Sequence, residues 1–166
     1  MNKFMCRRYL LFCVSLFVNA LGIAFITKAA LGTSPITSVT YVLSMFTPFT
    51  IGQWTILLNL LFVILELFLM TREDLKSDLR MYLLQIPISF SFGMFIDLCM
   101  HYILFWLNPV EYVYMIVALL IGCVILAVGI ALEVKANAAM MAGEYFVKVI
   151  TRRFRGEFGY IKLGFD

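Results

Sequence analysis

Long runs of apolar side chains, each interrupted by only a few polar residues, extend along most of the chain. A helix needs about 20 apolar residues to cross a hydrocarbon core of about 30 Å. Four stretches reach that length and predict membrane-spanning helices over residues 9–27, 51–70, 81–106 and 112–132. A further apolar stretch, residues 158–166, predicts the start of another span. The pattern therefore predicts an all-α polytopic membrane protein.

One segment of this pattern occurs twice. Residues 22–29 (GIAFITKA) return as residues 129–136 (GIALEVKA), a shift of 107 positions, and the same shift carries Gly52 onto Gly159 without a gap. Membrane chains built from two copies of one unit are typical of transporters, whose binding sites lie between the copies. The duplication therefore predicts two related units and a site at their boundary.

The first unit covers residues 1–107 and the second covers residues 108–166. The shift maps the span at residues 81–106 beyond the last residue, so the second unit is incomplete. We therefore expect this chain to be a piece of a protein of about 210–220 residues, by analogy with complete paired repeats.

A shorter helix follows the first span. Ser34 or Thr33 can cap it and Pro35 suits its first turn, so the sequence predicts a helix over about residues 34–46. Its length of about 18 Å is too short to cross a membrane. A re-entrant half-helix is the favoured interpretation and a short tilted crossing is the alternative. The second unit has its equivalent half-helix at about residues 137–151.

Loop charges distinguish these two interpretations, because short cytoplasmic loops are enriched in lysine and arginine. Basic residues occur in residues 3–8, 72–80 and 152–155, whereas residues 107–111 have none. If residues 29–49 re-enter, all three basic segments lie on one side of the membrane. This arrangement predicts inverted repeats of three crossings each and a cytoplasmic N-terminus.

Composition supports the membrane assignment. The chain is 63% hydrophobic and 14% charged, against soluble averages of about 45–50% and about 25%. The net charge of +3 is small, and no basic stripe with interleaved aromatic residues indicates nucleic-acid binding. The four cysteines lack metal-ligand spacing and His101 is the single histidine, so the sequence predicts neither a metal site nor a cofactor.

The segment after the first span carries a family resemblance. Residues 30–39 (ALGTSPITSV), together with Gly52, the Gly93-x-x-Ile96-Asp97 stretch and the ending IKLGFD, resemble the bacterial YczE/YyaS/YitT family of integral membrane proteins. The resemblance covers essentially the whole chain, and the family's last helices are missing. It implies a multi-pass protein of the bacterial cytoplasmic membrane and no settled biochemical activity.

The break before each half-helix is the predicted substrate site. A helix N-terminus carries unpaired N–H groups and a partial positive charge, and two such termini meeting in the membrane would form a pocket. A capped turn, and lysines that reach the interface, are the structural alternatives. The predicted substrate-binding residues are Gly32, Thr33, Ser34, Pro35, Lys28, Lys135 and Asn137.

Polar side chains within apolar spans are costly and are therefore candidates for function. The set is Asn19, Gln53, Asn59, Glu66, Gln85, Asp97, Glu133 and Glu144. Asn59 and Asp166 are equivalent under the shift, and Asp97 shares a predicted helix face with His101. These patterns predict ion coupling at Asn59, Asp166 and Asp97. Interhelical hydrogen bonds of about 1 kcal/mol are the structural alternative.

These patterns favour a secondary carrier or permease for an unidentified small solute, with one repeat rocking against the other. The alternative is a non-transporting membrane protein that binds and regulates a partner. The chain lacks nucleotide-binding, metalloprotease and hydrolase motifs, so we expect no enzymatic activity and no catalytic residues. Expected partners are the lipid bilayer and anionic lipid near Arg152, Arg153 and Arg155, and homo-oligomerisation stays open.

Overall fold

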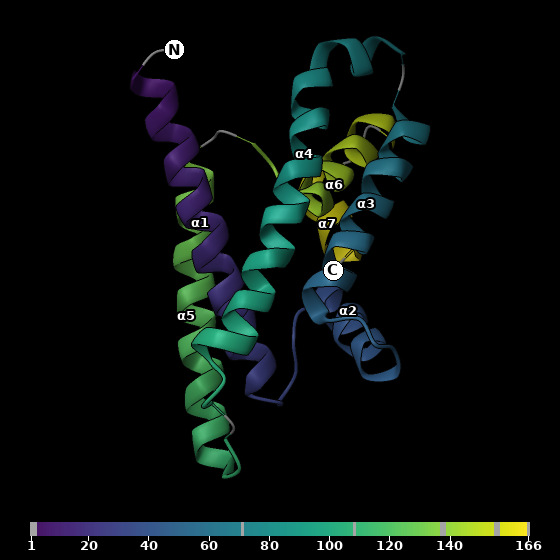
Figure 1. Ribbon diagram of the computed structural model, residues 1–166. Coiled ribbons are helices and arrows are strands. Elements are labelled where there is room, and N and C mark those ends of the chain that lie inside the picture. The colour runs from purple at the N-terminus through teal and green to yellow at the C-terminus, as the bar shows by residue number, and fades with distance from the viewer. Residues whose placement is uncertain (1–2, 71, 108, 137–138, 155–156, 166) are drawn as a thin grey trace.

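The computed structural model describes residues 3–70, 72–107, 109–136, 139–154 and 157–165, and its regular elements are all helices (Figure 1). In chain order they are α1 (Lys3–Lys28), α2 (Pro35–Phe46), α3 (Ile51–Leu69), α4 (Arg72–Leu98), the π-helical turn η1 (Cys99–Ile103), α5 (Tyr112–Ala136), α6 (Ala142–Phe154) and α7 (Phe158–Phe165).

Four helices in the described part of the chain are long and apolar enough to cross a membrane. They cover Arg7–Lys28, Ile51–Leu69, Met81–Ile103 and Tyr112–Ala136. Each coincides with one of the four spans predicted from the apolar pattern, so the prediction of an all-helical chain with four spans is confirmed. The predicted fifth stretch forms the short helix α7.

Local sequence signals explain where α2 and α3 begin. Ser34 is the N-cap of α2, its hydroxyl oxygen accepts a hydrogen bond from the Thr37 N–H, and Pro35 is the first helical residue. At α3, Thr50 and Gln53 form a reciprocal capping box. The predicted start of the short helix at residues 34–35 and its end at Phe46 are therefore confirmed.

Helices α1 and α5 form a closely packed antiparallel pair. Glycines allow the approach: Gly22 lies against Leu126, and Gly129 lies against Asn19. A Cβ atom on either glycine would lie within 3 Å of the facing residue. Because the partner's number falls as the number along α1 rises, the helices run in opposite directions. Small residues of this kind let membrane helices pack backbone to backbone.

Helices α3 and α4 form a second antiparallel pair. Gly52 and Gly93 face each other so closely that a Cβ on either would overlap the other's carbonyl oxygen. Further along, the Tyr82 hydroxyl donates to the Val63 carbonyl oxygen at 3.2 Å. Helix α4 also crosses α1, where the rings of Phe17 and Phe95 meet edge to face at 5.6 Å. Thus α4 joins the α1–α5 pair to the rest of the molecule.

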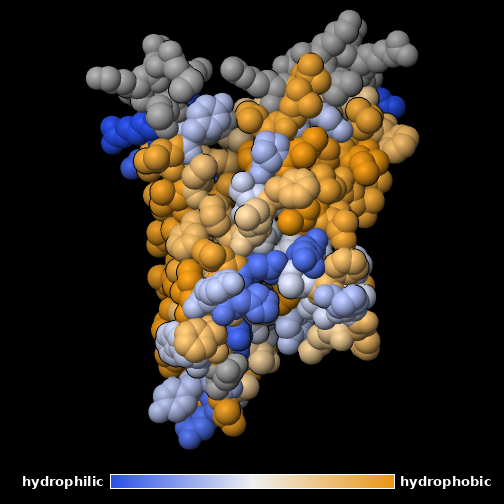
Figure 2. Space-filling model, viewed as in Figure 1, coloured by the Kyte–Doolittle hydropathy of each residue, from blue (hydrophilic) through white to orange (hydrophobic). Residues whose placement is uncertain are grey.

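Figure 1 also shows how the ends of the helices are arranged. The start of α1, the end of α3, the start of α4 and the end of α6 lie in the upper half of the view, and the start of α5 lies at the lower end. Because α1 ends and α3 begins in the lower half, residues 29–50 leave and return towards the same end. In Figure 2, apolar surface covers most of the height of the molecule, as expected for helices that face lipid.

Candidate functional site

A cavity of about 220 Å³ lies where all seven α-helices approach one another, and we call it the central cavity. One wall comes from α1 and α5. The facing wall comes from α2, α3, α6 and α7, and α4 contributes Phe92 and Ile96. Its polar lining residues are Asn19, Ser34, Thr37, Thr40, Thr55, Asn59, Glu133, Glu144 and Lys162.

The α1–α5 wall carries a buried amide–carboxylate pair. The Asn19 side-chain Nδ2 donates to Glu133 Oε2 at 2.8 Å, and the two residues are only 3% and 6% exposed. Within the described part of the chain, Asn19 Oδ1 and Glu133 Oε1 have no hydrogen-bond partner. A buried acceptor without a partner costs about 1–3 kcal/mol, and more when it is charged. This wall therefore holds two buried acceptor oxygens that no described residue satisfies.

The facing wall contains the starts of two helices. Ile36, in the first turn of α2, has its Cδ1 atom 3.5 Å from the position that a Cβ on Gly143 would occupy, so the first turns of α2 and α6 are in contact. The first intrahelical bond of α6 runs from the Tyr145 N–H to the Met141 carbonyl. Met141 stands at the cap position but its side chain has no capping oxygen, unlike Ser34 at the start of α2.

Charged side chains enter the central cavity from α5, α6 and α7. Lys162 Nζ lies 3.7 Å from Glu144 Oε1, and both side chains are about 40% exposed. This pair balances its own charge. Glu133 also interacts electrostatically with both Lys162 and Glu144, so the described cavity lining holds one lysine and two carboxylates.

The predicted substrate-binding residues are only partly brought together. Ser34 lines the central cavity. Gly32, with a φ of 142°, and Thr33 lie in the segment before it, and Pro35 is the first residue of α2. Neither of the two predicted lysines forms part of the cavity wall: Lys28 is the half-buried last residue of α1, and Lys135 is exposed near the end of α5. Asn137 lies outside the described residues.

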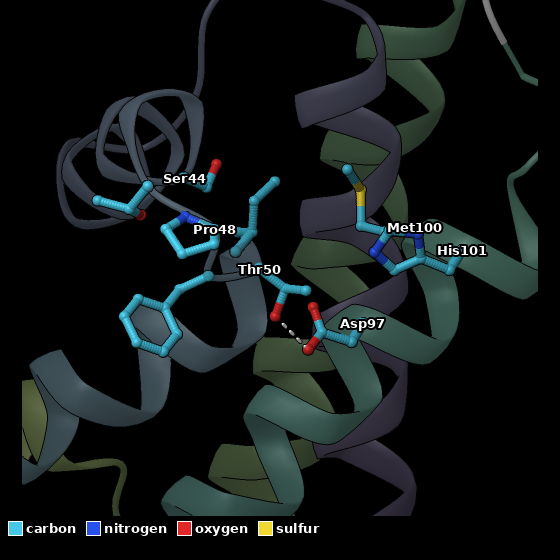
Figure 3. Close-up of a pocket in the computed structure, with 9 residues that line it drawn as sticks. Ser44, Pro48, Thr50, Asp97, Met100 and His101 are labelled. Carbon is cyan, nitrogen blue, oxygen red and sulfur yellow. Dashed lines mark hydrogen bonds between the residues drawn. The ribbon is translucent and has the colours of Figure 1, made fainter.

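Of the predicted ion-coupling residues, too, only some lie at the central cavity. Asn59 is buried and lines the central cavity, while Asp166 lies outside the described residues. Asp97 lies elsewhere, beside a second cleft of about 310 Å³ that includes Ser44, Pro48, Met100 and His101 (Figure 3).

Asp97 has a clear structural partner at the start of α3. Its Oδ2 accepts from the Thr50 hydroxyl at 2.6 Å (Figure 3). Its Oδ1 accepts from the Gly52 N–H at 2.9 Å. Both oxygens are therefore occupied by the positive end of a neighbouring helix. His101 lies within the π-helical turn η1, which begins two residues after Asp97, and both residues line the second cleft.

The sequence interpretation missed several cavity residues. It included Asn19, Glu133 and Glu144 as polar residues of interest but did not place them in the substrate site, and it omitted Lys162 and the threonine hydroxyls. The shift of 107 positions could have indicated these residues, because it pairs Lys162 with Thr55 and Glu144 with Thr37, which are all polar. Polar residues at equivalent positions of both copies would have predicted these members of the cavity lining.

These features define an apolar, helical protein of the membrane type with an internal cavity whose largely apolar lining includes several polar side chains. The chain belongs to the DUF6198 family, a family of unknown function, whose model matches residues 6–166. No curated protein and no solved structure gives a match to this chain. The resemblance to the YczE/YyaS/YitT family stays a prediction from its motif.

Proposed function

We propose that this protein is a secondary carrier that binds a small solute in the central cavity. The observation that carries the proposal is the buried pair Asn19 and Glu133, two residues that line a cavity inside an apolar bundle and hold two buried acceptors without a described partner. Polar groups of this kind are retained in membrane helices where they serve a solute or ion pathway. The role requires no catalytic residue.

The shift of 107 positions supports a site between two copies. Helix α2 begins at residue 35 and α6 at residue 142, and α3 begins at residue 51 and α7 at residue 158. Most residues of the cavity wall also fall into pairs related by this shift. The pairs are Asn19 and Leu126, Ile23 and Ile130, Ser34 and Met141, Ile36 and Gly143, Thr37 and Glu144, and Thr55 and Lys162.

The contacts favour an inverted relation between the copies. The shift converts the contact of Gly22 with Leu126 into the contact of Gly129 with Asn19, so each is the image of the other. Ile36 likewise lies against its own equivalent, Gly143. Exchange of partners in this way is the property of a two-fold axis. Because α1 and α5 are antiparallel, we infer an axis in the plane of the membrane, as in inverted-repeat carriers.

Packing suggests which parts move. Helix α1 packs mainly on α5, while α3 packs on α4, α6 and α2, and the central cavity lies between these two groups. Each group combines helices from both copies. We therefore propose that the α1–α5 pair moves against the group of α2, α3, α6 and α7, in place of one whole repeat against the other.

Charge placement supports an orientation in the cytoplasmic membrane of a bacterium. The basic segments at the start of α1, the start of α4 and the end of α6 lie in the upper half of Figure 1, which we assign to the cytoplasm. Residues 29–50 then re-enter from the outer side. Arg152 and Arg153 are exposed at the end of α6 and would face anionic lipid there.

Cysteine labelling tests this orientation. In a version without native cysteines, an impermeant maleimide should label Glu111→Cys on intact cells, and it should label Ser77→Cys only after the cells are opened. Labelling of Ser77→Cys on intact cells would make residues 29–50 a true crossing and would overturn the inverted arrangement.

A second labelling experiment tests the carrier itself without knowing the solute. Thr55→Cys replaces a buried residue of the cavity wall, and Ser15→Cys replaces a buried residue outside it. A carrier should expose Thr55→Cys to the reagent from both faces, in right-side-out and in inverted vesicles, and Ser15→Cys should stay unlabelled. Labelling from one face only, or from neither, would contradict alternating access and favour a protein that regulates a partner.

A further inference from the structure

We propose that the ligand of the central cavity is a small zwitterion with an ammonium and a carboxylate on one carbon, the chemistry of an α-amino acid. The inference rests on the proposed function only in placing a solute in this cavity. It assigns each end of the ligand to one wall.

The α1–α5 wall suits the ammonium. Glu133 Oε1 and Asn19 Oδ1 are both acceptors, both are buried, and neither has a partner among the described residues. An ammonium has three donors and no acceptor, so it can satisfy both oxygens and also balance the carboxylate charge. A neutral donor such as a hydroxyl would add no positive charge to a described lining in which Glu133 and Glu144 share the one lysine, Lys162.

The facing wall suits the carboxylate. The first turns of α2 and α6 meet at Ile36 and Gly143, and a helix start attracts negative charge through its N–H groups. Ser34 already caps α2, whereas Met141 offers α6 no side-chain oxygen. Gly143 lines the cavity without a side chain that would cover the backbone there. Lys162 lies on the same wall, where it is paired with Glu144 at 3.7 Å and can offer its other N–H donors to a ligand carboxylate.

Size and the remaining lining narrow the class further. Drug-sized ligands occupy pockets of about 300–1,000 Å³, and the central cavity is smaller at about 220 Å³. The apolar part of the lining is aliphatic or aromatic and includes Ile23, Ile130, Phe92 and Ile96. This lining suits a short apolar side chain, so alanine and valine are the natural probes.

Binding to the wild-type protein in lipid nanodiscs provides the first test. Calorimetric titration would compare L-alanine with ethylamine, which keeps the ammonium, and with propionate, which keeps the carboxylate. We expect L-alanine to bind and each half-ligand to bind at least tenfold more weakly, because each engages one wall only. Ethylamine binding as tightly as alanine would make this a cation site, and propionate doing so would make it an anion site. Either result, or no binding of L-alanine or L-valine, overturns the proposal.

Variants then test the assignment of the walls. Glu133→Gln should weaken alanine binding at least 100-fold, and Lys162→Met should weaken it about tenfold. The matched control is Glu66→Gln, which changes another fully buried carboxylate that does not line the cavity and should leave the affinity unchanged. Asn19→Leu introduces the residue found at the equivalent position 126, and it should also weaken binding if Glu133→Gln fails to fold. Unchanged affinity in folded Glu133→Gln or Asn19→Leu protein would overturn the ammonium assignment.

The two proposals fail separately. If L-alanine binds but Thr55→Cys is labelled from one face only, the zwitterion site stands and the carrier is refuted. If Thr55→Cys is labelled from both faces but no probe binds, the carrier stands and the zwitterion inference is refuted.

Discussion

Asp97 on α4 and Glu133 on α5 each place a carboxylate inside the helical bundle, but their oxygens meet different surroundings. Both oxygens of Asp97 accept hydrogen bonds from the first residues of α3, at 2.6 and 2.9 Å. Glu133 accepts one hydrogen bond, from the Asn19 amide, and its other oxygen has no partner in the described part of the chain. A carboxylate whose acceptors are all occupied holds helices together, whereas one with a free acceptor beside a cavity is prepared for a ligand.

The largest expected effect on stability tests whether Asp97 holds α4 to the start of α3. Asp97→Ala leaves the Thr50 hydroxyl and the Gly52 N–H without their acceptor, and each hydrogen bond to a charged group contributes about 1.5–3 kcal/mol. We expect a loss of about 3 kcal/mol in the free energy of unfolding, measured by denaturant titration in mixed micelles. Asp97→Ala protein as stable as the wild type would remove the structural role assigned to Asp97.

The second-largest expected effect tests the contact between α1 and α5 that brings Asn19 to Glu133. In Gly129→Ala the new Cβ would overlap the side chain and backbone of Asn19, so α1 and α5 must separate. Overpacking of this kind costs about 1–3 kcal/mol, and we expect a loss of about 2 kcal/mol. Gly159→Ala is the control, because no atom lies within 4 Å of its new Cβ. Equal stabilities of the two variants would contradict the close approach of α1 and α5.

A smaller effect compares the two helix starts of the facing wall. Ser34→Ala removes the side-chain oxygen that caps α2, which costs about 1 kcal/mol. The same change should leave alanine affinity within about threefold, because the carboxylate is assigned to the start of α6, and a threefold change is about 0.7 kcal/mol. Thermal unfolding and calorimetry on one preparation check both values. A large loss of affinity at unchanged stability would move the carboxylate to α2.

The smallest expected change in stability belongs to Glu133→Gln. Removing a buried charge that has one partner only also removes its desolvation penalty, so we expect a change of about 0.5 kcal/mol or less. Ligand binding should fall in the same variant although its stability does not. Glu133→Gln protein destabilised as strongly as Asp97→Ala protein would show that both carboxylates are structural.

The apolar pattern and the capping residues predicted much of the fold. Four spans, the start of α2 after Ser34 and its end at Phe46 all appear where the sequence places them. These features depend on neighbours within one helix or turn, which a single sequence displays directly. The duplicated lysines were a weaker guide to the site, because Lys28 and Lys135 lie at helix ends outside the cavity wall.

By itself, the sequence determined which segments are helical and apolar enough to cross a membrane, because hydrophobicity and capping act over a few residues. Only the tertiary structure decided that Asn19 meets Glu133, that Asp97 binds the start of α3, and that α2 and α6 begin beside each other. These partners are distant in the chain, and they are selected by the rotation and crossing of whole helices at glycine contacts such as Gly129 with Asn19. Such crossings depend on packing between helices, which the periodicity of one helix does not encode.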